Sequence, residues 1–354
     1  MIEKATIQKI IEEAVQAPSG DNAQPWRFVL TDEGVEVHNV ERDQTLFNFE
    51  RRGDYIAHGA LLENISIIAG HYGLTADTKL FPNGYGLHIA TVSFANGGSG
   101  NDDLYQAIEK RATNRKPYNG EMISETDKQK LLEVARESDT VRVLIANEKD
   151  AVKKIAQAAS LNDWLILKNK AIREFLFSII RWTDEEERMS PGMHVQTLEL
   201  KPPQQKIFRL FRNERIARIA TRIGFSNIMR KEAEALYGTS GGMLVVMLKD
   251  KRPEDFITGG MLFQRVWLLV TAIGLSMQPL AAVPYLAQRI KAGSGEGIPR
   301  DQVDKILEAE QNIRQAAGAQ DGIIAMVARI GKADRPTGRA FKLRPDITWH
   351  INNI

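Results

Sequence analysis

The sequence predicts a fold of mixed helices and strands, of the α+β or α/β class, built from two related halves. Two observations predict it: short β-rich runs alternate with stretches of helical period, and one helix-like segment recurs far along the chain. The composition agrees, since 43% of the 354 residues are apolar and 26% are charged. A chain of this length buries a sizeable core without disulfides.

The recurring segment is a buried helix that ends in a glycine. Residues 59–74, GALLENISIIAGHYGL, and residues 260–275, GMLFQRVWLLVTAIGL, match at a constant offset of 201. Both have the apolar spacing of a buried helix, and the final Gly suits a helix C-terminus. A weaker echo pairs 10–16 with 131–137, each followed by a strand-like run. The two echoes indicate an old duplication.

The remaining elements follow from local patterns. A helix is predicted near the N-terminus, and the Gly/Ser/Asn-rich stretch 96–102 is the linker candidate. The first half is therefore 1–97 and the second 104–354. Strands are expected at 26–30, 35–40, 87–94, 141–145, 243–248 and 323–330.

The second half is longer mainly because of an insertion at 160–235. We expect it to contain an aromatic helix from Trp164 to Trp182, an acidic patch at 184–187, a Pro-containing loop and a basic helix over 206–222. Residues 201–231 carry nine Lys or Arg against Glu214 alone, a local net charge of +8. Because the whole chain is only +2, the basicity is regional.

The basic helix has a cationic face and an apolar face. Arginines recur at steps of three and four, opposite Phe208, Phe211, Ile216, Ile219 and Ile223. We interpret this as a solvated face over a packed apolar stripe. The alternatives that remain open are contact with an anionic membrane surface, with nucleic acid or with the phosphates of NADPH.

Composition also excludes several classes of protein. The chain has no Cys, so it has no disulfide framework, thiolate nucleophile or Cys-ligated metal, which fits a cytoplasmic location. The acidic, helical N-terminus predicts no signal peptide. Apolar runs such as 266–275 are too short to cross a bilayer, so no transmembrane segment is expected.

The most informative motif is APSGDNAQPW at 17–26, which joins a helix to a strand. Small residues and a Pro let backbone amides approach a flat ligand closely. Asn22 and Gln24 offer donors and acceptors that suit the edge of a heterocycle. From spacing alone, an ordinary helix-to-strand turn is the favoured interpretation of the motif.

A second motif, RATNRKPY at 111–118, follows a helical stretch. Arg111 and Arg115 flank the hydroxyl of Thr113, and such a group can hold a phosphate by charge-assisted hydrogen bonds. The plain alternative is a helix C-terminus decorated with cations that suit the macrodipole.

Together the two motifs resemble the nitroreductase family of FMN flavoproteins. PSGDNAQPW at 18–26 is similar to the family's Pro-Ser motif, RATNR to its phosphate motif, and GLSMQPL at 274–280 to its turn beside the flavin ring. The stretch 328–339 resembles the family's last strand and basic loop. The resemblance assigns cofactor contacts to Pro18, Ser19, Gly20, Asn22, Gln24, Arg111, Ala112, Thr113, Arg115, Pro279, Leu280, Ala281 and Arg339.

The resemblance also implies an architecture. It implies an α+β fold, a nitroreductase-like mixed β-sheet flanked by helices, duplicated within one chain as a pseudo-dimer like the fused, Acg-like members. Family dimers share two FMN sites between subunits, whereas each motif occurs once here. We therefore expect one complete FMN site per chain, a monomer, and further oligomerisation only as a possibility. Residues 75–79, TADTK, contain no Pro, which agrees with a degenerate second site.

Two further patterns carry no site. The six histidines have no metal-ligand spacing, so no metal is expected. The glycines of GSGEG at 293–297 follow no clear strand and indicate a flexible loop.

The resemblance implies an FMN-dependent oxidoreductase that relays hydride from NAD(P)H to a quinone or nitroaromatic acceptor. No catalytic side chain is named, because the cofactor does the chemistry. The alternative is a flavin-binding or flavin-sequestering protein, whose insertion at 160–235 closes over the flavin as a lid. A third hypothesis is a surface-binding module based on the basic helix. We expect no nucleic-acid partner.

Overall fold

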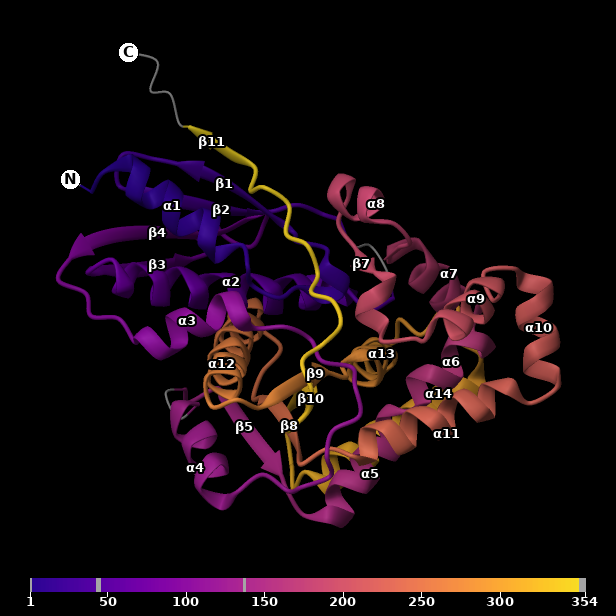
Figure 1. The fold of residues 1–354 in the computed structure, drawn as a ribbon. Helices are drawn as coiled ribbons and strands as arrows, with labels where there is room; N and C mark the ends of the chain where they lie inside the picture. The colour runs from indigo at the N-terminus through magenta and orange to yellow at the C-terminus, as the bar shows by residue number, and fades with distance from the viewer. Residues whose placement is uncertain (1, 43–45, 136–137, 350–354) are drawn as a thin grey trace.

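Two β-sheets with the same strand order form the centre of the computed structural model, which describes residues 2–42, 46–135 and 138–349 (Figure 1). The last two residues of the 131–137 echo lie outside these ranges. The first sheet has the order β11 (Ile347–Trp349), β1 (Trp26–Leu30), β2 (Gly34–Asn39), β4 (His88–Asn96) and β3 (Leu74–Leu80). The second has the order β5 (Val141–Ala146), β8 (Gly242–Leu248), β10 (Ile323–Gly331) and β9 (Ser276–Pro279).

The helices complete the duplicated pattern. In chain order the first half is α1, β1, β2, α2, β3 and β4, and the second is α4, β5, β8, α12, β9 and β10. All neighbouring strands within these two sets are antiparallel. The fold is therefore α+β and internally duplicated. The helices outside the insertion are α1 (Lys4–Ala14), α2 (Arg52–His71), α3 (Asp102–Lys110), α4 (Glu125–Val134), α5 (Lys149–Ala159), α12 (Pro253–Ala272), α13 (Ala282–Lys291) and α14 (Arg300–Ala316), with short 3-10 turns at Gly20–Asn22 and Phe49–Arg51.

The long helices α2 and α12 pack on each other where the two halves meet. They cross at Gly59 and Gly260, where a Cβ would lie 2.0 Å from the Ile257 carbonyl oxygen and 2.1 Å from the Ile56 carbonyl oxygen, respectively. Ile56 and Ile257 are separated by the same offset of 201 as the two glycines. The crossing is thus two-fold related, and only Gly allows backbones to approach so closely.

The predicted strands and helix ends agree closely with the structure. Both long helices are followed by a Gly with a left-handed backbone, Gly73 with φ 74° and Gly274 with φ 78°. Every residue of β8 is buried, because helices cover both faces of the second sheet, whereas β1 has an exposed residue at Arg27. Both helices begin earlier than the repeat indicated, at Arg52 and Pro253.

The C-terminal segment crosses from one half to the other. After β10 it runs past the junction of the halves and ends as β11, which pairs in parallel with β1 (Figure 1). Phe28 lies opposite Ile347 in this pairing. The first sheet is therefore completed by residues more than 300 positions further along the chain.

The insertion consists of short helices around a small apolar core. It contains α6 (Leu161–Lys168), α7 (Lys170–Ile179), β6 (Ile180–Arg181), α8 (Asp184–Met189), β7 (Met193–His194), a 3-10 turn at Val195–Leu198, α9 (Pro202–Leu210), α10 (Glu214–Arg222) and α11 (Phe225–Gly238). Leu167, Phe177, Val195 and Phe211 are among the residues of its core.

Two helices predicted in the insertion are each divided in the structure. The aromatic helix from Trp164 to Trp182 breaks at Asn169, whose side chain accepts a hydrogen bond from Ile172 N and begins α7. The basic helix over 206–222 breaks at Asn213, whose side chain accepts from Arg215 N and Ile216 N and begins α10. In both cases an Asn caps a new helix, a role that side-chain periodicity does not reveal.

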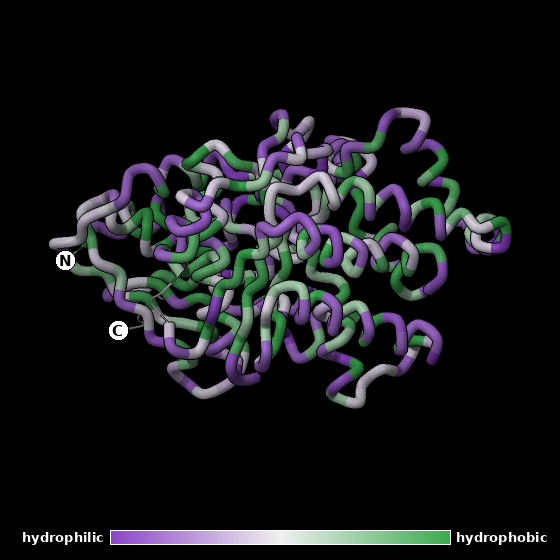
Figure 2. The backbone as a smooth tube through the Cα atoms, turned by 90° about the horizontal axis from the view of Figure 1, so that it is seen from below, coloured by the Kyte–Doolittle hydropathy of each residue, from purple (hydrophilic) through white to green (hydrophobic). Residues whose placement is uncertain are grey.

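The apolar stripe predicted for the basic helix is not packed along α10. Ala217 and Ala220 are the buried residues of this helix, whereas Ile216, Ile219 and Ile223 are exposed. Phe211 does lie in the core, as expected. In the part of the chain at the right edge of Figure 2, far from both termini, purple hydrophilic residues alternate with green hydrophobic ones. In the described ranges, no helix has both the length and the apolar character that crossing a membrane requires.

Candidate functional site

The second and third motifs lie side by side. Thr113 forms an isolated parallel bridge with Met277 of β9, and Asn114 N donates to the Met277 carbonyl at 2.9 Å. The Asn114 amide also donates to Ser276 Oγ at 2.9 Å. The segment 111–115 thus extends along the edge of the second sheet, next to the turn that contains Pro279, Leu280 and Ala281.

Arg111 connects this pair of motifs to the first one. Arg111 is 5% exposed, and its guanidinium donates to the Gln16 carbonyl at 2.8 Å and lies 4.5 Å from the centre of the Trp267 ring. Gln16 immediately precedes the Ala17-Pro18-Ser19 stretch. All three motifs therefore meet at one place, between the C-terminus of α3 and the end of α1.

Arg111, Arg339 and Lys342 form a cluster of cations at this meeting point. Arg339 donates to Gln16 Oε1 at 3.0 Å, and Lys342 donates to the Ala17 carbonyl and to Asn22 Oδ1, both at 2.8 Å. These acceptors are neutral oxygens. We refer to the three side chains as the cation cluster.

The three cations of the cluster repel one another, and the charge of Glu109 offsets only part of the effect of burial on Arg339. Burial, together with the smaller effect of the Arg339 charge, lowers the pKa of Arg111 to about 9. Burial also holds the pKa of Lys342 well below its usual range, with added repulsion from Arg111 and Arg339. Arg111 Nε is buried and has no hydrogen-bond partner among the described residues. An anion placed here would relieve the repulsion and accept this hydrogen bond.

The loop at 18–26 has a constrained backbone. Asp21, Asn22 and Gln24 have φ values of 49°, 60° and 51°, in the left-handed region that non-Gly residues rarely occupy. Ser19 Oγ accepts from Gln24 N at 2.9 Å and braces the turn. Gly20 is exposed, and a Cβ there would meet no atom within 4 Å.

The amides of Asn22 and Gln24 hold other parts of the chain. Asn22 Nδ2 donates to the Phe341 and Gly192 carbonyls, both at 2.9 Å, and Gln24 Oε1 accepts from Leu343 N at 2.9 Å. Both side chains are buried. We expected these amides to face a heterocycle; in the structure they fix the loop against the C-terminal segment and the insertion.

Arg115 faces the insertion and does not join the cation cluster. Its guanidinium donates to the Thr197 carbonyl at 2.9 Å and lies 3.3 Å from Met193 Sδ. Burial lowers the pKa of Arg115, and the charge of Asp21 opposes this effect. Because Gly192 also contacts Asn22, residues 192–197 of the insertion lie against both the first and the second motif.

The turn after β9 supplies backbone groups. Leu280 N donates to the Val327 carbonyl at 2.7 Å, so this donor is engaged by the sheet. Ala281 N is the next backbone donor along the chain, just before α13. Beneath the turn, the buried Arg329 donates to Gln278 Oε1 at 2.7 Å and to the Lys116 carbonyl at 2.8 Å. Arg329 therefore fixes the second motif to the third.

Sequence reasoning missed Lys342 and Arg329. Lys342 lies in an irregular segment with no motif around it, so no local signal marks it. Arg329 has a recognisable signal, because it is a lone cation in the apolar strand run IIAMVARI. A buried Arg needs partners, and here the backbone of the second motif provides them.

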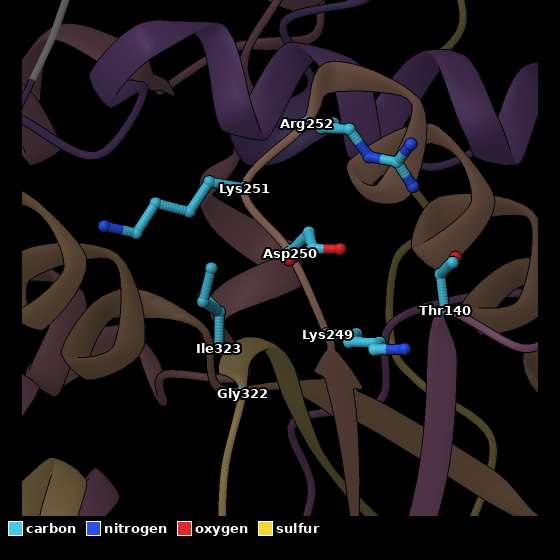
Figure 3. A pocket seen from close by; sticks show the side chains of 7 residues that line it. All are labelled: Thr140, Lys249, Asp250, Lys251, Arg252, Gly322 and Ile323. Carbon is cyan, nitrogen blue, oxygen red and sulfur yellow. The ribbon is translucent and has the colours of Figure 1, made fainter.

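Two hollows in the described part of the structure lie away from the motifs. The larger, with a volume of about 940 Å³, is an open depression lined by Thr140, residues 249–252 and Gly322–Ile323 (Figure 3). In Figure 3 the side chains of Lys251 and Arg252 point away from each other, and Arg252 is engaged by Asp255 at 3.0 Å. A smaller cavity of about 220 Å³ lies between Arg52 and helices α13 and α14. No motif residue lines either of these two hollows. We therefore place the candidate functional site at the meeting point of the motifs.

Two of the six histidines lie together. His38 and His88 stack with ring centroids 4.5 Å apart, and His38 Nε2 is 2.9 Å from Glu36 Oε2. These three residues could present ligand atoms within 4.8 Å of one another, which the spacing along the chain did not indicate. His350 lies outside the described residues.

No known family model matches the chain. An uncharacterized protein of Mycobacterium tuberculosis is 23% identical over 292 residues, covering 78% of this chain and 39% of that protein. The protein named "Putative NAD(P)H nitroreductase acg" from the same species is 27% identical over 183 residues, covering 50% of this chain and 54% of that protein. The chain thus spans about half or less of these relatives' length.

Solved structures show a more distant likeness. The FMN-dependent nitroreductase NfnB from Mycobacterium smegmatis, in complex with NADPH, aligns with a TM-score of 0.37 and 12% identity over 67% of this chain and 90% of that chain. A nitroreductase with bound FMN from Desulfitobacterium hafniense aligns with a TM-score of 0.35 and 13% identity over 66% and 89%.

Proposed function

We propose, on the premise that this chain is an Acg-like member of the nitroreductase family, that it is an FMN-dependent oxidoreductase of the nitroreductase type. Its reductant would be NAD(P)H, and its acceptor a quinone or a nitroaromatic compound. The observation that carries the proposal is the cation cluster, three positive side chains that meet beside the Pro-Ser loop with neutral oxygens as partners.

The cation cluster fits the phosphate of FMN. Arg111 offers a buried Nε–H that has no hydrogen-bond partner among the described residues. The Arg339 side chain is exposed, and Lys342 is half-buried. A phosphate group carries close to two negative charges at neutral pH, so it would offset most of the local excess. Arg111 and Arg339 would hold the phosphate, and Thr113 is the nearby hydroxyl of the motif.

The remaining motif residues would hold the ring system and the sugar chain. Pro18, Ser19, Gly20 and Ala112 supply small side chains and accessible backbone, and the turn at Pro279 and Leu280 would support one edge of the ring, with Ala281 N as a donor. When bound, FMN supplies two-electron hydride chemistry. The protein's own contribution is to bind, orient and shield the cofactor, and no side-chain acid or base is required.

A second candidate function is flavin binding without turnover, and the position of the insertion favours it. Residues 187–199 make three contacts around the meeting point: the Gly192 carbonyl accepts from Asn22, the Thr197 carbonyl accepts from Arg115, and Glu199 accepts from Thr337 N at 2.6 Å. A segment held by so many contacts would restrict the approach of a nicotinamide nucleotide. We propose that this part of the 160–235 insertion acts as a lid.

Stopped-flow reduction of the FMN-loaded protein tests these alternatives. The oxidoreductase hypothesis expects rapid flavin bleaching by NADH or NADPH. The sequestering hypothesis expects slow bleaching by either nucleotide and fast bleaching by dithionite, which is small. Glu199→Gln, which removes the charged contact to Thr337, should then accelerate reduction by the nucleotide but not by dithionite. Equal nucleotide rates in Glu199→Gln and the parent protein would argue against a lid.

Binding of FMN compared with riboflavin tests the phosphate assignment. Arg111→Ala should weaken FMN but leave riboflavin unchanged, because riboflavin has no phosphate. Arg115→Ala should affect both flavins alike, since Arg115 lies outside the cation cluster. A chain that binds neither flavin at micromolar concentration would contradict the proposal as a whole.

We also propose one FMN per chain, because each motif occurs once. Flavin absorbance against protein mass measures the ratio. A ratio of two would contradict the single-site proposal without affecting the choice of cofactor.

A further inference from the structure

The surface of α10 and its neighbours combines exposed aliphatic side chains with a high density of arginine. Six large aliphatic residues between positions 207 and 228 are exposed, and Ile219 and Ile223 reach 58% and 75% exposure. Single exposed apolar residues are ordinary, but such a concentration in one segment marks an interaction surface. The exposed residues are Ile207, Leu210, Ile216, Ile219, Ile223 and Ile228.

On α10 the two kinds of side chain form adjacent stripes. Ile216, Ile219 and Ile223 follow one another at steps of three and four, and Arg215, Arg218 and Arg222 do the same one position earlier. One position corresponds to about 100° around the helix axis. Ala217 and Ala220 occupy the third sector and anchor the helix to the insertion. The aliphatic and cationic stripes therefore both face away from the protein.

The charge of this surface is only slightly neutralised nearby. Residues 201–231 have a net charge of +8, and their one acidic residue, Glu214, is shared between the buried Arg173 and Arg218, whose guanidinium lies 3.5 Å from the carboxylate. Arg215, Arg218 and Arg222 are all exposed. A complementary partner must therefore be strongly anionic and must also offer an apolar phase to the isoleucines.

We propose that the surface formed by α10 and the flanking ends of α9 and α11 binds anionic lipid bilayers. A helix with an apolar stripe beside an arginine stripe lies in the plane of a membrane interface, with the aliphatic side chains in the acyl boundary and the cations among the headgroups. This is peripheral contact, and it leaves the rest of the chain outside the bilayer.

Other partners match the surface less well. Nucleic acid would use the cations but not the isoleucines, and the nearby rings that could stack on bases, Phe208 and Phe211, are turned toward the insertion core. A second copy placed symmetrically would bring the same positive surface against itself. An anionic bilayer satisfies both stripes at once.

Flotation with extruded vesicles tests the proposal on the full chain. Vesicles of equal parts phosphatidylglycerol and phosphatidylcholine should carry the protein, and vesicles of phosphatidylcholine alone should not. Raising the salt concentration should weaken the binding, because it screens the cations. Absence of binding to the anionic vesicles at low salt would overturn the proposal.

Two triple variants separate the contributions of the stripes. Replacing Arg215, Arg218 and Arg222 with Gln should lower the partition coefficient by on the order of 100-fold. Replacing Ile216, Ile219 and Ile223 with Ser should lower it at least tenfold at unchanged charge. If the Ser variant binds as well as the parent, the contact is electrostatic adsorption only and the proposal fails.

Matched controls use exposed residues elsewhere. The charge control removes three positive charges from α5 by changing Lys149, Lys153 and Lys154 to Gln. The apolar control removes exposed apolar surface by changing Leu87, Met122 and Met189 to Ser. Both controls should float like the parent protein. An equal loss of vesicle binding in the control variants would overturn the proposal. The proposal would also fail if the protein did not bind vesicles but bound a DNA or RNA oligonucleotide, or associated with itself, and the α10 variants lost that interaction.

Discussion

Arg111 connects the three motifs, and the surroundings of its charge explain why it should matter for anion binding. Its charge is buried beside two other cations, so the folded chain gains little from it without an anion. Arg111→Ala should weaken FMN binding by about 1.5–3 kcal/mol, the value of a charge-assisted hydrogen bond.

The measurement is the FMN dissociation constant from fluorescence quenching. Arg335→Ala is the matched control, because Arg335 is an exposed Arg in the same C-terminal segment. We expect the control to bind FMN like the parent protein. Equal weakening in both variants would indicate a general electrostatic effect rather than a phosphate contact.

His58 should make the folded state sensitive to acid. Its ring is fully buried on α2, with Nε2 2.8 Å from Asn39 Oδ1, and burial lowers its pKa to about 3, an effect that the Pro25 backbone partly opposes. Between pH 6.5 and pH 3 the unfolded chain therefore binds a proton that the folded chain does not. The stability contributed by neutral His58 is present above pH 6.5 and is lost as the pH falls.

The expected loss through His58 is about 2 kcal/mol between pH 7 and pH 5. Urea unfolding at both values should show a smaller loss for His58→Gln than for the parent protein. His71→Gln serves as the control, because this ring is more accessible and sits at the end of the same helix. Parallel pH dependence in the parent and His58→Gln would contradict the prediction.

For individual residues of the candidate site, the resemblance to the nitroreductase family predicted more than local sequence patterns did. Arg111 and Arg339 were expected from their motif positions, and the structure brings both to Gln16. Lys342 had no motif, and only the path of the C-terminal segment places it there. The burial of Asn22 and Gln24 could not be predicted either, because their partners are between 170 and 319 residues away.

The crossing of α2 and α12 should be the element contact least tolerant of change. A methyl group at Gly59 or Gly260 would lie about 2 Å from a backbone oxygen of the other helix, so the helices would have to separate. Gly59→Ala and Gly260→Ala should each destabilise the protein by about 3 kcal/mol or more.

Thermal unfolding followed by circular dichroism measures this effect. Gly238→Ala is the control, since a Cβ at this helical position would meet no atom within 4 Å. That variant should unfold at the parent temperature or slightly above. A neutral Gly59→Ala would show that the helices are not held so closely in solution.

Helices and strands differed in how well their ends could be predicted. Strand 26–30 was predicted with its observed bounds, because alternating apolar residues and a flanking Pro mark it clearly. The breaks at Asn169 and Asn213 were missed, since apolar periodicity continues across both. The exposure of Ile219 was missed because small alanines, not the larger isoleucines, form the packed side of α10.

The whole molecule should not separate into two folded halves. The first sheet takes its edge strand, β11, from the C-terminal segment, and α2 buries one side on α12. A chain of residues 1–97 alone would expose both surfaces, so it should be unfolded or aggregated. Circular dichroism and sedimentation of this fragment provide the measurement, and a monomeric fragment with a cooperative transition would contradict it.

Co-expression of the fragments 1–97 and 104–354 provides the complementary experiment. If the halves bury the same surfaces on each other as in the intact chain, they should co-purify. This tests the proposed boundary at 98–103, which covers most of the loop 97–101 between β4 and α3 and the first two residues of α3. The offset of 201 predicted the duplication itself, but not the crossing of the C-terminal segment, because β11 has only three residues and no marked apolar pattern.

The route of that segment also sets an order of events during synthesis. The cation cluster combines Arg111 with Arg339 and Lys342, so it cannot exist until the ribosome has passed position 342. A product terminated anywhere before position 339 would lack two of the three charges as well as the edge strand. If the cluster holds the flavin phosphate, only chains translated past position 342 can bind FMN through it. The yellow colour of a preparation would then report the fraction of chains that include this position.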